Sequence, residues 1–336
     1  MNRVSCGQFA ALLLITDAFA LFCLMGNVSI ITACGFVTGV ILQFLISIPT
    51  ANFYKNGGTL KSSPKPFAWF YLIYIVLWGG LLFVMLWNAS EEITIPAEKF
   101  SLIPEKFIIT GLIAVTCLYA SSPGEKALSR AALITAALGA VCIAVIVISA
   151  IPKSRVEYLA DLSCSDGFFS ELSRGFVLSG GLGSFIVLLG FTKGTPLKSA
   201  AGYFIGKAVL FAVVPATAAA AAGGIMEITD FPIITAAELS QPFSSQRIDS
   251  LFLIIFVILA VFAISVQTVT ASYLLSTVIP SFKRFRSTAV LAAMTGSAFL
   301  MSGINQYSVI YSIAVVMAAA VVPLLMVLSK RAERRT

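Results

Sequence analysis

The sequence predicts an all-α integral membrane protein with ten transmembrane helices, arranged as two inverted sets of five. Three observations lead to this prediction: the composition, the number of apolar stretches, and the distribution of Lys and Arg among the connecting segments. Of the 336 residues, 59% are hydrophobic and only 11% are charged, whereas a soluble domain carries about 25% charged residues. So few charges cannot cover a water-facing surface, and composition therefore indicates a membrane protein.

The apolar stretches are judged against the roughly 20 residues that a helix needs to cross a bilayer. Ten stretches meet or approach this length, at about 8–26, 28–50, 67–88, 105–121, 130–151, 175–192, 200–224, 249–277, 287–303 and 306–329. The connecting segments are short, and the longest lie at about 152–174 and 225–248. No separate soluble domain is expected, and residues 1–336 are predicted to form one transmembrane domain in the lipid bilayer.

The Lys and Arg residues support an even number of spans. If the N-terminus is cytoplasmic, sixteen of the 22 basic residues fall on the cytoplasmic side, as the positive-inside rule requires. We therefore expect a multi-pass protein of the cell membrane with both termini in the cytoplasm. The net charge of +7 needs no nucleic-acid partner, because the basic tail SKRAERRT is suited to an anionic leaflet.

Ten spans divide into two repeats, at about 8–151 and 175–329. Because five is odd, the second repeat enters the membrane from the opposite side. This is the geometry of an inverted-topology repeat, which places its binding site at mid-membrane between discontinuous helices.

The sixth stretch, RGFVLSGGLGSFIVLLGF, has a glycine-rich centre that contains Gly180, Gly181 and Gly183, flanked by Ser179 and Ser184. Each glycine weakens a helix by about 1 kcal/mol relative to alanine. An unwound segment within a membrane needs a ligand, water or protein to satisfy its backbone groups. The stretch is therefore either a broken helix that binds a small polar molecule or a site of close helix packing through small residues.

The first stretch carries Thr16 and Asp17 at its centre. A carboxylate at mid-span costs roughly 2.5–3.5 kcal/mol on insertion scales and usually faces a cavity or a partner. Asp17 either serves a ligand, by pairing with an ammonium group, binding a cation or carrying a proton, or is a buried, hydrogen-bonded structural residue. In an inverted repeat it lies on the span equivalent to the glycine-rich one.

Further polar and aromatic residues lie at mid-span. Tyr74 and Trp78 on the third stretch and Ser265 on the eighth are candidates to contact a ligand, and Gln267 beside Ser265 suits either helix association or ligand contact. Lys207 lies near the start of the seventh stretch, and we expect it to extend its ammonium group to the cytoplasmic interface.

Enzymatic chemistry is not expected. The chain has no histidine, which excludes Ser-His-Asp catalysis and imidazole metal sites. None of its six cysteines forms a CxxC pair, so they are interpreted as small buried hydrophobic residues. We expect neither a cofactor nor a metal.

Local motifs carry a family resemblance along nearly the whole chain. The opening VSCGQFAALLLI, the connection YASSPGEKALSRAALI and the long stretch FPIITAAELSQPFSSQRIDSLFLIIFVILAVFAISV resemble the B subunits of endospore germinant receptors. The residues that match are Tyr119, Gly124, Glu125 and Arg130 in the connection, and Phe231, Pro232, Arg247, Asp249 and Phe252 in the long stretch. These are permease-like spore germination proteins within the amino acid–polyamine–organocation superfamily.

The resemblance implies a 5+5 inverted repeat of the LeuT/APC type, with a germinant pocket among the first, third, sixth and eighth spans. It also implies A- and C-type partner subunits in the spore inner membrane, and a small germinant such as an amino acid that triggers spore germination. The sequence departs from the family in the first span, where Thr16-Asp17-Ala18-Phe19 replaces a Gly-Thr-Gly-like break. Two other functions remain open: a proton-coupled amino acid secondary transporter, with Asp17 as the proton-coupling group, and a scaffolding subunit.

Overall fold

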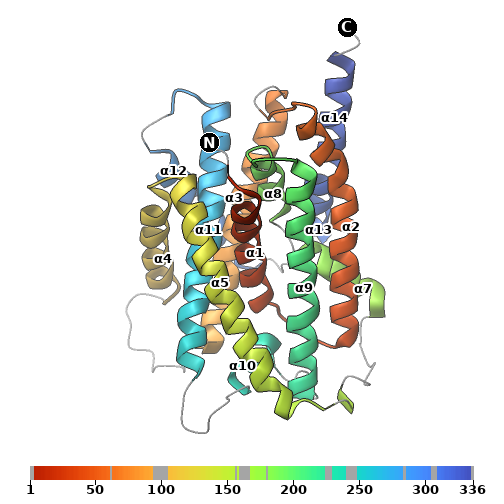
Figure 1. The fold of residues 1–336 in the computed structure, drawn as a ribbon. Helices are drawn as coiled ribbons and strands as arrows, with labels where there is room; N and C mark the ends of the chain where they lie inside the picture. Colours follow the sequence, from red (N-terminus) through yellow and green to blue (C-terminus); the bar gives the residue numbers. More distant parts are fainter. Residues whose placement is uncertain are drawn as a thin grey trace.

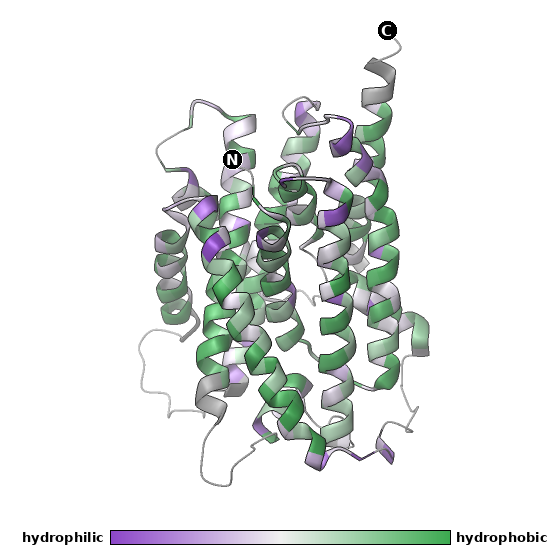
Figure 2. Ribbon diagram, viewed as in Figure 1, coloured by the Kyte–Doolittle hydropathy of each residue, from purple (hydrophilic) through white to green (hydrophobic). Residues whose placement is uncertain are grey.

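The computed structural model describes residues 4–60, 63–93, 105–155, 157–158, 167–178, 181–223, 229–239, 248–282, 285–303 and 309–333. Within these ranges the chain is helical, and the one strand-like pairing is an isolated bridge between Val4 and Thr192. The long helices run side by side as a bundle (Figure 1). Apolar residues cover most of their length, and hydrophilic residues gather mainly toward their ends (Figure 2).

The first half of the chain forms α1 (Cys6–Phe22), α2 (Ile30–Lys55), α3 (Lys65–Ile93), α4 (Glu105–Ser121) and α5 (Glu125–Ala150). The first two helices begin with reciprocal capping boxes, in which Ser5 pairs with Gln8 and Ser29 pairs with Thr32. Each box satisfies two backbone donors at a helix start, so the local sequence fixes where α1 and α2 begin.

The second half begins with two short helices in the place of the sixth span, α7 (Gly167–Leu178) and α8 (Leu182–Leu189). They are followed by α9 (Pro196–Ala222), the short α10 (Pro232–Leu239), α11 (Ile248–Val278) and α12 (Arg286–Met301). The last span comprises α13 (Val309–Val316), a π-helical turn at Met317–Val321 and α14 (Val322–Glu333).

Helices lie in all ten of the predicted stretches, but length does not establish ten crossings. Within the described residues, six apolar helices are long enough to span a membrane, namely α2, α3, α5, α9, α11 and the segment Ser312–Ser329. The pair α7 and α8 makes a seventh span when counted together, whereas Cys6–Phe22 and Phe107–Ser121 are shorter apolar helices. The structure thus shows a multi-helix membrane protein, and the count of ten stays a prediction.

The short helix α1 lies in the interior of the bundle, where it packs against α5, α9 and α11 (Figure 1). From Ile15 to Phe22 every side chain is buried. A helix that is apolar on all sides and buried has no lipid-facing stripe, so α1 forms part of the core on which the other helices pack. This position carries Asp17 into the interior of the protein.

Candidate solute-binding site at the helix break

Asp17 is part of a buried ionic cluster between α1 and α9. Its side chain is 2% exposed, and its Oδ1 lies 3.3 Å from the Nζ of Lys207, which is fully buried. The Tyr203 hydroxyl donates to Oδ2 of Asp17 at 2.6 Å, and Lys207 Nζ donates to the Tyr203 hydroxyl oxygen at 3.1 Å. Both carboxylate oxygens therefore have partners from α9.

The expectation that Lys207 reaches the cytoplasmic interface is wrong. Lys207 lies eleven residues beyond the start of α9 at Pro196, which places it about 16 Å into the helix at 1.5 Å per residue. Asp17 lies the same number of residues beyond the start of α1 at Cys6. The two opposite charges therefore meet at the same distance, about 16 Å, from the starts of their helices.

Aromatic rings surround the ammonium group of Lys207. Its Nζ lies 5.4 Å from the ring centres of both Tyr203 and Phe211, one turn before it and one turn after it on α9. Tyr203 in turn stacks on Phe185 of α8 at 5.5 Å and meets the edge of Phe9 of α1 at 6.3 Å. These cation–π and ring contacts hold the pair in a fixed position between three helices.

The chain bends between α7 and α8 beside this cluster, in the stretch for which the sequence allows either a broken helix or close packing through small residues. The axes of the two helices differ by 48°. A Cβ on Gly181 would lie 3.9 Å from Oδ1 of Asp17 and from Cγ2 of Thr16. Gly181 is therefore adjacent to Asp17, while the predicted site residues Ser179 and Gly180 fall outside the described residues.

The remaining predicted site residues fall into two groups. Gly183 packs against Tyr74 of α3 so closely that a Cβ would lie 2.5 Å from the ring, and Ser184 is hydrogen-bonded to Gln267 of α11. These contacts bring α3 and α11 to the first turn of α8. Trp78 and Ser265 are buried.

The helix α1 itself is continuous through Thr16 and Asp17. Thr16 is buried, and its hydroxyl donates to the carbonyl of Leu12, one turn earlier in the same helix. A helical turn that satisfies its own polar groups leaves no free backbone for a ligand. Of α1 and the α7–α8 pair, only the pair is interrupted within the described residues, and α1 contributes the Asp17 side chain.

A row of small and polar residues on α2 holds the outer half of the broken helix. Residues 35, 39 and 43 of α2 lie one turn apart, which aligns them on one face. A Cβ on Gly35 would lie 2.8 Å from the backbone of Glu171, and one on Gly39 would lie 3.0 Å from the amide nitrogen of Phe176. Gln43 donates through Nε2 to the Phe176 carbonyl at 2.7 Å, near the end of α7, where helix carbonyls lack intrahelical partners.

Each end of α1 is also tied to the broken helix. On one side Arg174 of α7 donates to the carbonyls of Met25 and Asn27 in the α1–α2 loop and pairs with the buried Glu171 at 3.2 Å. On the other side, Val4 exchanges backbone hydrogen bonds with Phe191 and Lys193 just beyond α8, at 2.9 and 2.7 Å. Both ends of α1 are thus attached to the segments that flank the break.

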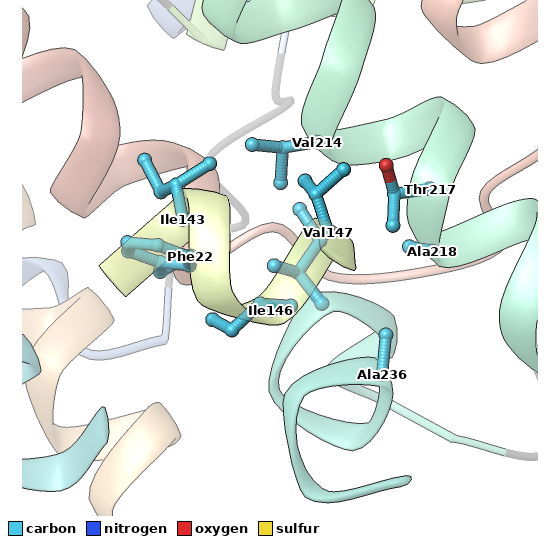
Figure 3. A pocket seen from close by; sticks show the side chains of 9 residues that line it. Phe22, Ile143, Ile146, Val147, Val214, Thr217, Ala218 and Ala236 are labelled. Carbon is cyan, nitrogen blue, oxygen red and sulfur yellow. The ribbon is translucent and has the colours of Figure 1, made fainter. Parts of the chain in front are cut away.

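Two cavities lie away from the ionic cluster. The smaller one, of about 10 Å³, lies between the end of α1, α5, α9 and α10, and the side chains that face it are almost all apolar (Figure 3). A space of this size holds about one water molecule. The second, of about 190 Å³, is an apolar groove between α2 and α9 that includes the exposed Ile41 and Ile205. Neither offers the polar groups that a small polar solute requires.

Comparisons with known proteins agree on the fold. The sequence matches no family model and no curated protein. Among solved structures, the chain is similar to Mhp1, a nucleobase-cation-symport-1 family transporter, in a closed conformation with bromovinylhydantoin bound. The TM-score is 0.63 at 13% sequence identity, and the match covers 97% of this chain and 78% of that one. This likeness shows that the chain shares the fold of that transporter.

The sequence reasoning missed Lys207, Tyr203 and Gln43 as members of the site. The predicted stretch at about 200–224 placed Lys207 near a span end, and the observed start of α9 at Pro196 is what reveals its depth. Tyr203 lies one turn before Lys207, which is the spacing that lets two side chains share a partner. The Gly35–Gly39–Gln43 spacing was the signal for a helix packed closely on α2.

Proposed function

We propose that this chain is a permease-like receptor subunit that binds a small polar solute at the α7–α8 break. By its resemblance to germinant receptor B subunits, the solute is a germinant such as an amino acid, and its binding triggers spore germination. The observation that carries the proposal is the position of Gly181, at the break and adjacent to the buried Asp17–Lys207 pair. Backbone groups freed by a break need a partner inside a membrane, and a solute supplies one.

The charges around the break favour a solute without net charge. Asp17 and Lys207 neutralise each other at 3.3 Å, so the cluster presents a dipole rather than a single charge. An isolated ion brought beside this pair would have to lose its hydration without gaining a full counter-charge. A neutral or zwitterionic molecule, such as an amino acid, avoids that cost.

Asp17 itself is a less direct partner for a solute ammonium group than its sequence position suggests. Both of its oxygens are engaged, by Lys207 and Tyr203. An incoming ammonium group would have to displace that of Lys207. We therefore assign Asp17 to shaping and neutralising the site beside Gly181 rather than to holding the amine of the solute on its own.

Binding must be coupled to a conformational change. Asp17, Lys207, Tyr203, Ser184 and Gln267 are all 2% exposed or less, so a solute enters only when one end of the site opens. A solute shifts such an equilibrium only if it binds one state more tightly than the other. In the proposed receptor, A- and C-type subunits in the spore inner membrane respond to that shift.

Deletion of the gene in the source organism tests the receptor role. We expect the deletion strain to form normal spores that fail to germinate with at least one single amino acid, and complementation to restore the response. Normal germination of the deletion strain with every germinant that acts on the parent strain, in a background without paralogues, would contradict the receptor role.

The second candidate function is a proton-coupled amino acid transporter, which the buried Asp17–Lys207 pair favours. Such a pair can exchange a proton when a conformational change separates its members. In proteoliposomes, this function predicts amino acid uptake driven by a proton gradient and abolished by Asp17→Asn. Binding without uptake would support the receptor over the transporter.

A further inference from the structure

Gln267 of α11 has a buried side-chain amide in which only the oxygen is hydrogen-bonded. The side chain is fully buried, and its Oε1 accepts a hydrogen bond from the Ser184 hydroxyl on the first turn of α8. Its Nε2 has no hydrogen-bond partner within the part of the chain that the structure describes. A buried donor without a partner costs about 1–3 kcal/mol, so a group that supplies an acceptor there gains at least part of this energy.

The first turn of α8 adds donors in the same place. The helix starts at Leu182, and its N-cap residue, Gly181, has no side chain that could accept a hydrogen bond from the first turn. The first backbone N–H groups of a helix have no intrahelical acceptor, and they form the positive end of the helix dipole. Ser184, which contacts Gln267, belongs to this first turn.

Negative charge is tolerated at this position because the nearby carboxylate is already neutralised. Oδ1 of Asp17 lies 3.9 Å from the place of a Cβ on Gly181, and the same oxygen is paired with Lys207. An oxygen acceptor at the start of α8 therefore does not face an uncompensated negative charge. The donors that belong to this region are the first N–H groups of α8 and the Gln267 amide, whose Oε1 is bonded to Ser184 of the same turn.

We propose that Gln267 is a specificity-determining residue of the site, and that its Nε2 donates to the carboxylate of an amino acid held at the start of α8. The inference rests on the proposed solute-binding function and adds the orientation of the solute to it. Ser184 acts as a positioning residue, because its hydroxyl donates to Oε1 and leaves Nε2 as the free donor of the amide.

The test uses the purified full-length chain in detergent. Standard L-amino acids are first tested one at a time for thermal stabilisation of the wild-type protein, and those that stabilise it are titrated to obtain Kd. For L-alanine and L-valine the matched probes without a carboxylate are ethylamine and isobutylamine. Gln267→Met, Gln267→Glu and Ser184→Ala are compared with Thr270→Val, a control on the same helix whose buried hydroxyl is satisfied by the Val266 carbonyl.

We expect Gln267→Met to raise the Kd of the amino acid by about tenfold or more, as loss of a hydrogen bond to a charged group predicts. Gln267→Glu, which keeps an acceptor for Ser184 but puts a negative charge beside the carboxylate, should weaken binding further. Ser184→Ala should have a smaller effect, and Thr270→Val none. The amines should bind more weakly than the amino acids.

Two results would overturn the inference while leaving the proposed function intact: unchanged Kd in both Gln267 variants, or equal affinity for an amino acid and its amine. If Gln267→Met loses binding and also melts at a lower temperature without solute, its loss of binding reflects a structural role of Gln267. In that case the stable Gln267→Glu variant is the test: weaker binding supports the inference, and unchanged binding overturns it. Failure of the wild-type chain to bind any amino acid would overturn the proposed function itself and this inference with it.

Discussion

At the scale of single residues, the buried pair of Asp17 and Lys207 is the central feature of the site. Each is buried, each carries a charge that a membrane interior disfavours, and each has the other as its counter-charge at 3.3 Å. Burying two charges is tolerable when geometry is good and further hydrogen bonds are made, and here Tyr203 bonds to both. Removing one member leaves the other without compensation.

We predict that Lys207→Met destabilises the protein strongly, by about 3–5 kcal/mol, the usual effect of breaking a buried ion pair. The double variant Asp17→Asn/Lys207→Met should lose less stability than the single one, because no charge is left unpaired. Melting temperatures of purified variants measure this, with the exposed Lys198→Met on the same helix as the control. A Lys207→Met protein as stable as Lys198→Met would contradict the ion pair.

The sequence predicts one member of this pair and not the other, for a physical reason. A lone acid in an apolar stretch is conspicuous. A lysine near the predicted end of a span can instead extend its ammonium group to the interface, so its charge does not indicate a buried partner. Only the helix start at Pro196 shows that Lys207 lies too deep for this. Depth depends on helix boundaries, which apolar patterns locate with an error of several residues.

At the scale of elements, a break between α7 and α8 is one of the two alternatives that the glycine-rich stretch allows, the other being close helix packing. Three glycines in four positions leave little helix propensity, and the two helices separate there by 48°. The structure also shows how α7 is held: it packs closely on α2 at Gly35 and Gly39, and its Phe176 carbonyl accepts a hydrogen bond from Gln43. Such contacts join residues more than 130 positions apart, which local propensity cannot indicate.

Gly35→Ala should therefore displace α7 and impair the site. A Cβ at this position would lie 2.8 Å from the Glu171 backbone, a distance at which the two helices must move apart. We expect the variant to lose solute binding, measured as thermal stabilisation by an amino acid. Gly111→Ala on α4 is the matched control, since a Cβ there meets nothing within 4 Å; equal behaviour of the two variants would contradict the packing role of Gly35.

Arg174 links α7 to the α1–α2 loop. We predict that the site opens at this end when the arginine is replaced. Arg174 reaches the carbonyls of Met25 and Asn27 and the carboxylate of Glu171. In a cysteine-free background carrying Thr16→Cys, we expect Arg174→Gln to increase labelling of that cysteine by a water-soluble thiol reagent added from the outer side. Arg155→Gln, which removes an exposed arginine, should leave labelling unchanged; equal labelling rates in the two variants would argue against a closing role for Arg174.

At the scale of the whole molecule, composition and apolar patterning suffice to predict a helical membrane protein, and the likeness to a transporter agrees with that class. The number of crossings is harder to obtain, because α1 and α4 are shorter than a full span. Their length is explained by position for α1, which lies inside the bundle and packs on other helices (Figure 1). A buried helix does not need to match the bilayer thickness.

The predicted topology can be measured directly. The start of α1 and the end of α14 lie toward the same end of the bundle (Figure 1), and the positive-inside rule places that end in the cytoplasm. Fusions of a periplasmically or externally active reporter to either terminus should be inactive, while a fusion in the α9–α10 connection should be active. Opposite activities at the two termini would contradict an even number of crossings.

The most direct test of the central claim is equilibrium binding of radiolabelled amino acids to purified wild-type, Gly181→Ala and Gly181→Leu proteins. A Cβ on Gly181 would lie 3.9 Å from Asp17 and Thr16, an ordinary contact, whereas a leucine side chain would extend into the space at the break. The account predicts saturable binding by the wild type and by Gly181→Ala, and no binding by Gly181→Leu at equal amounts of folded protein. Undiminished binding by Gly181→Leu would contradict a solute site at the break.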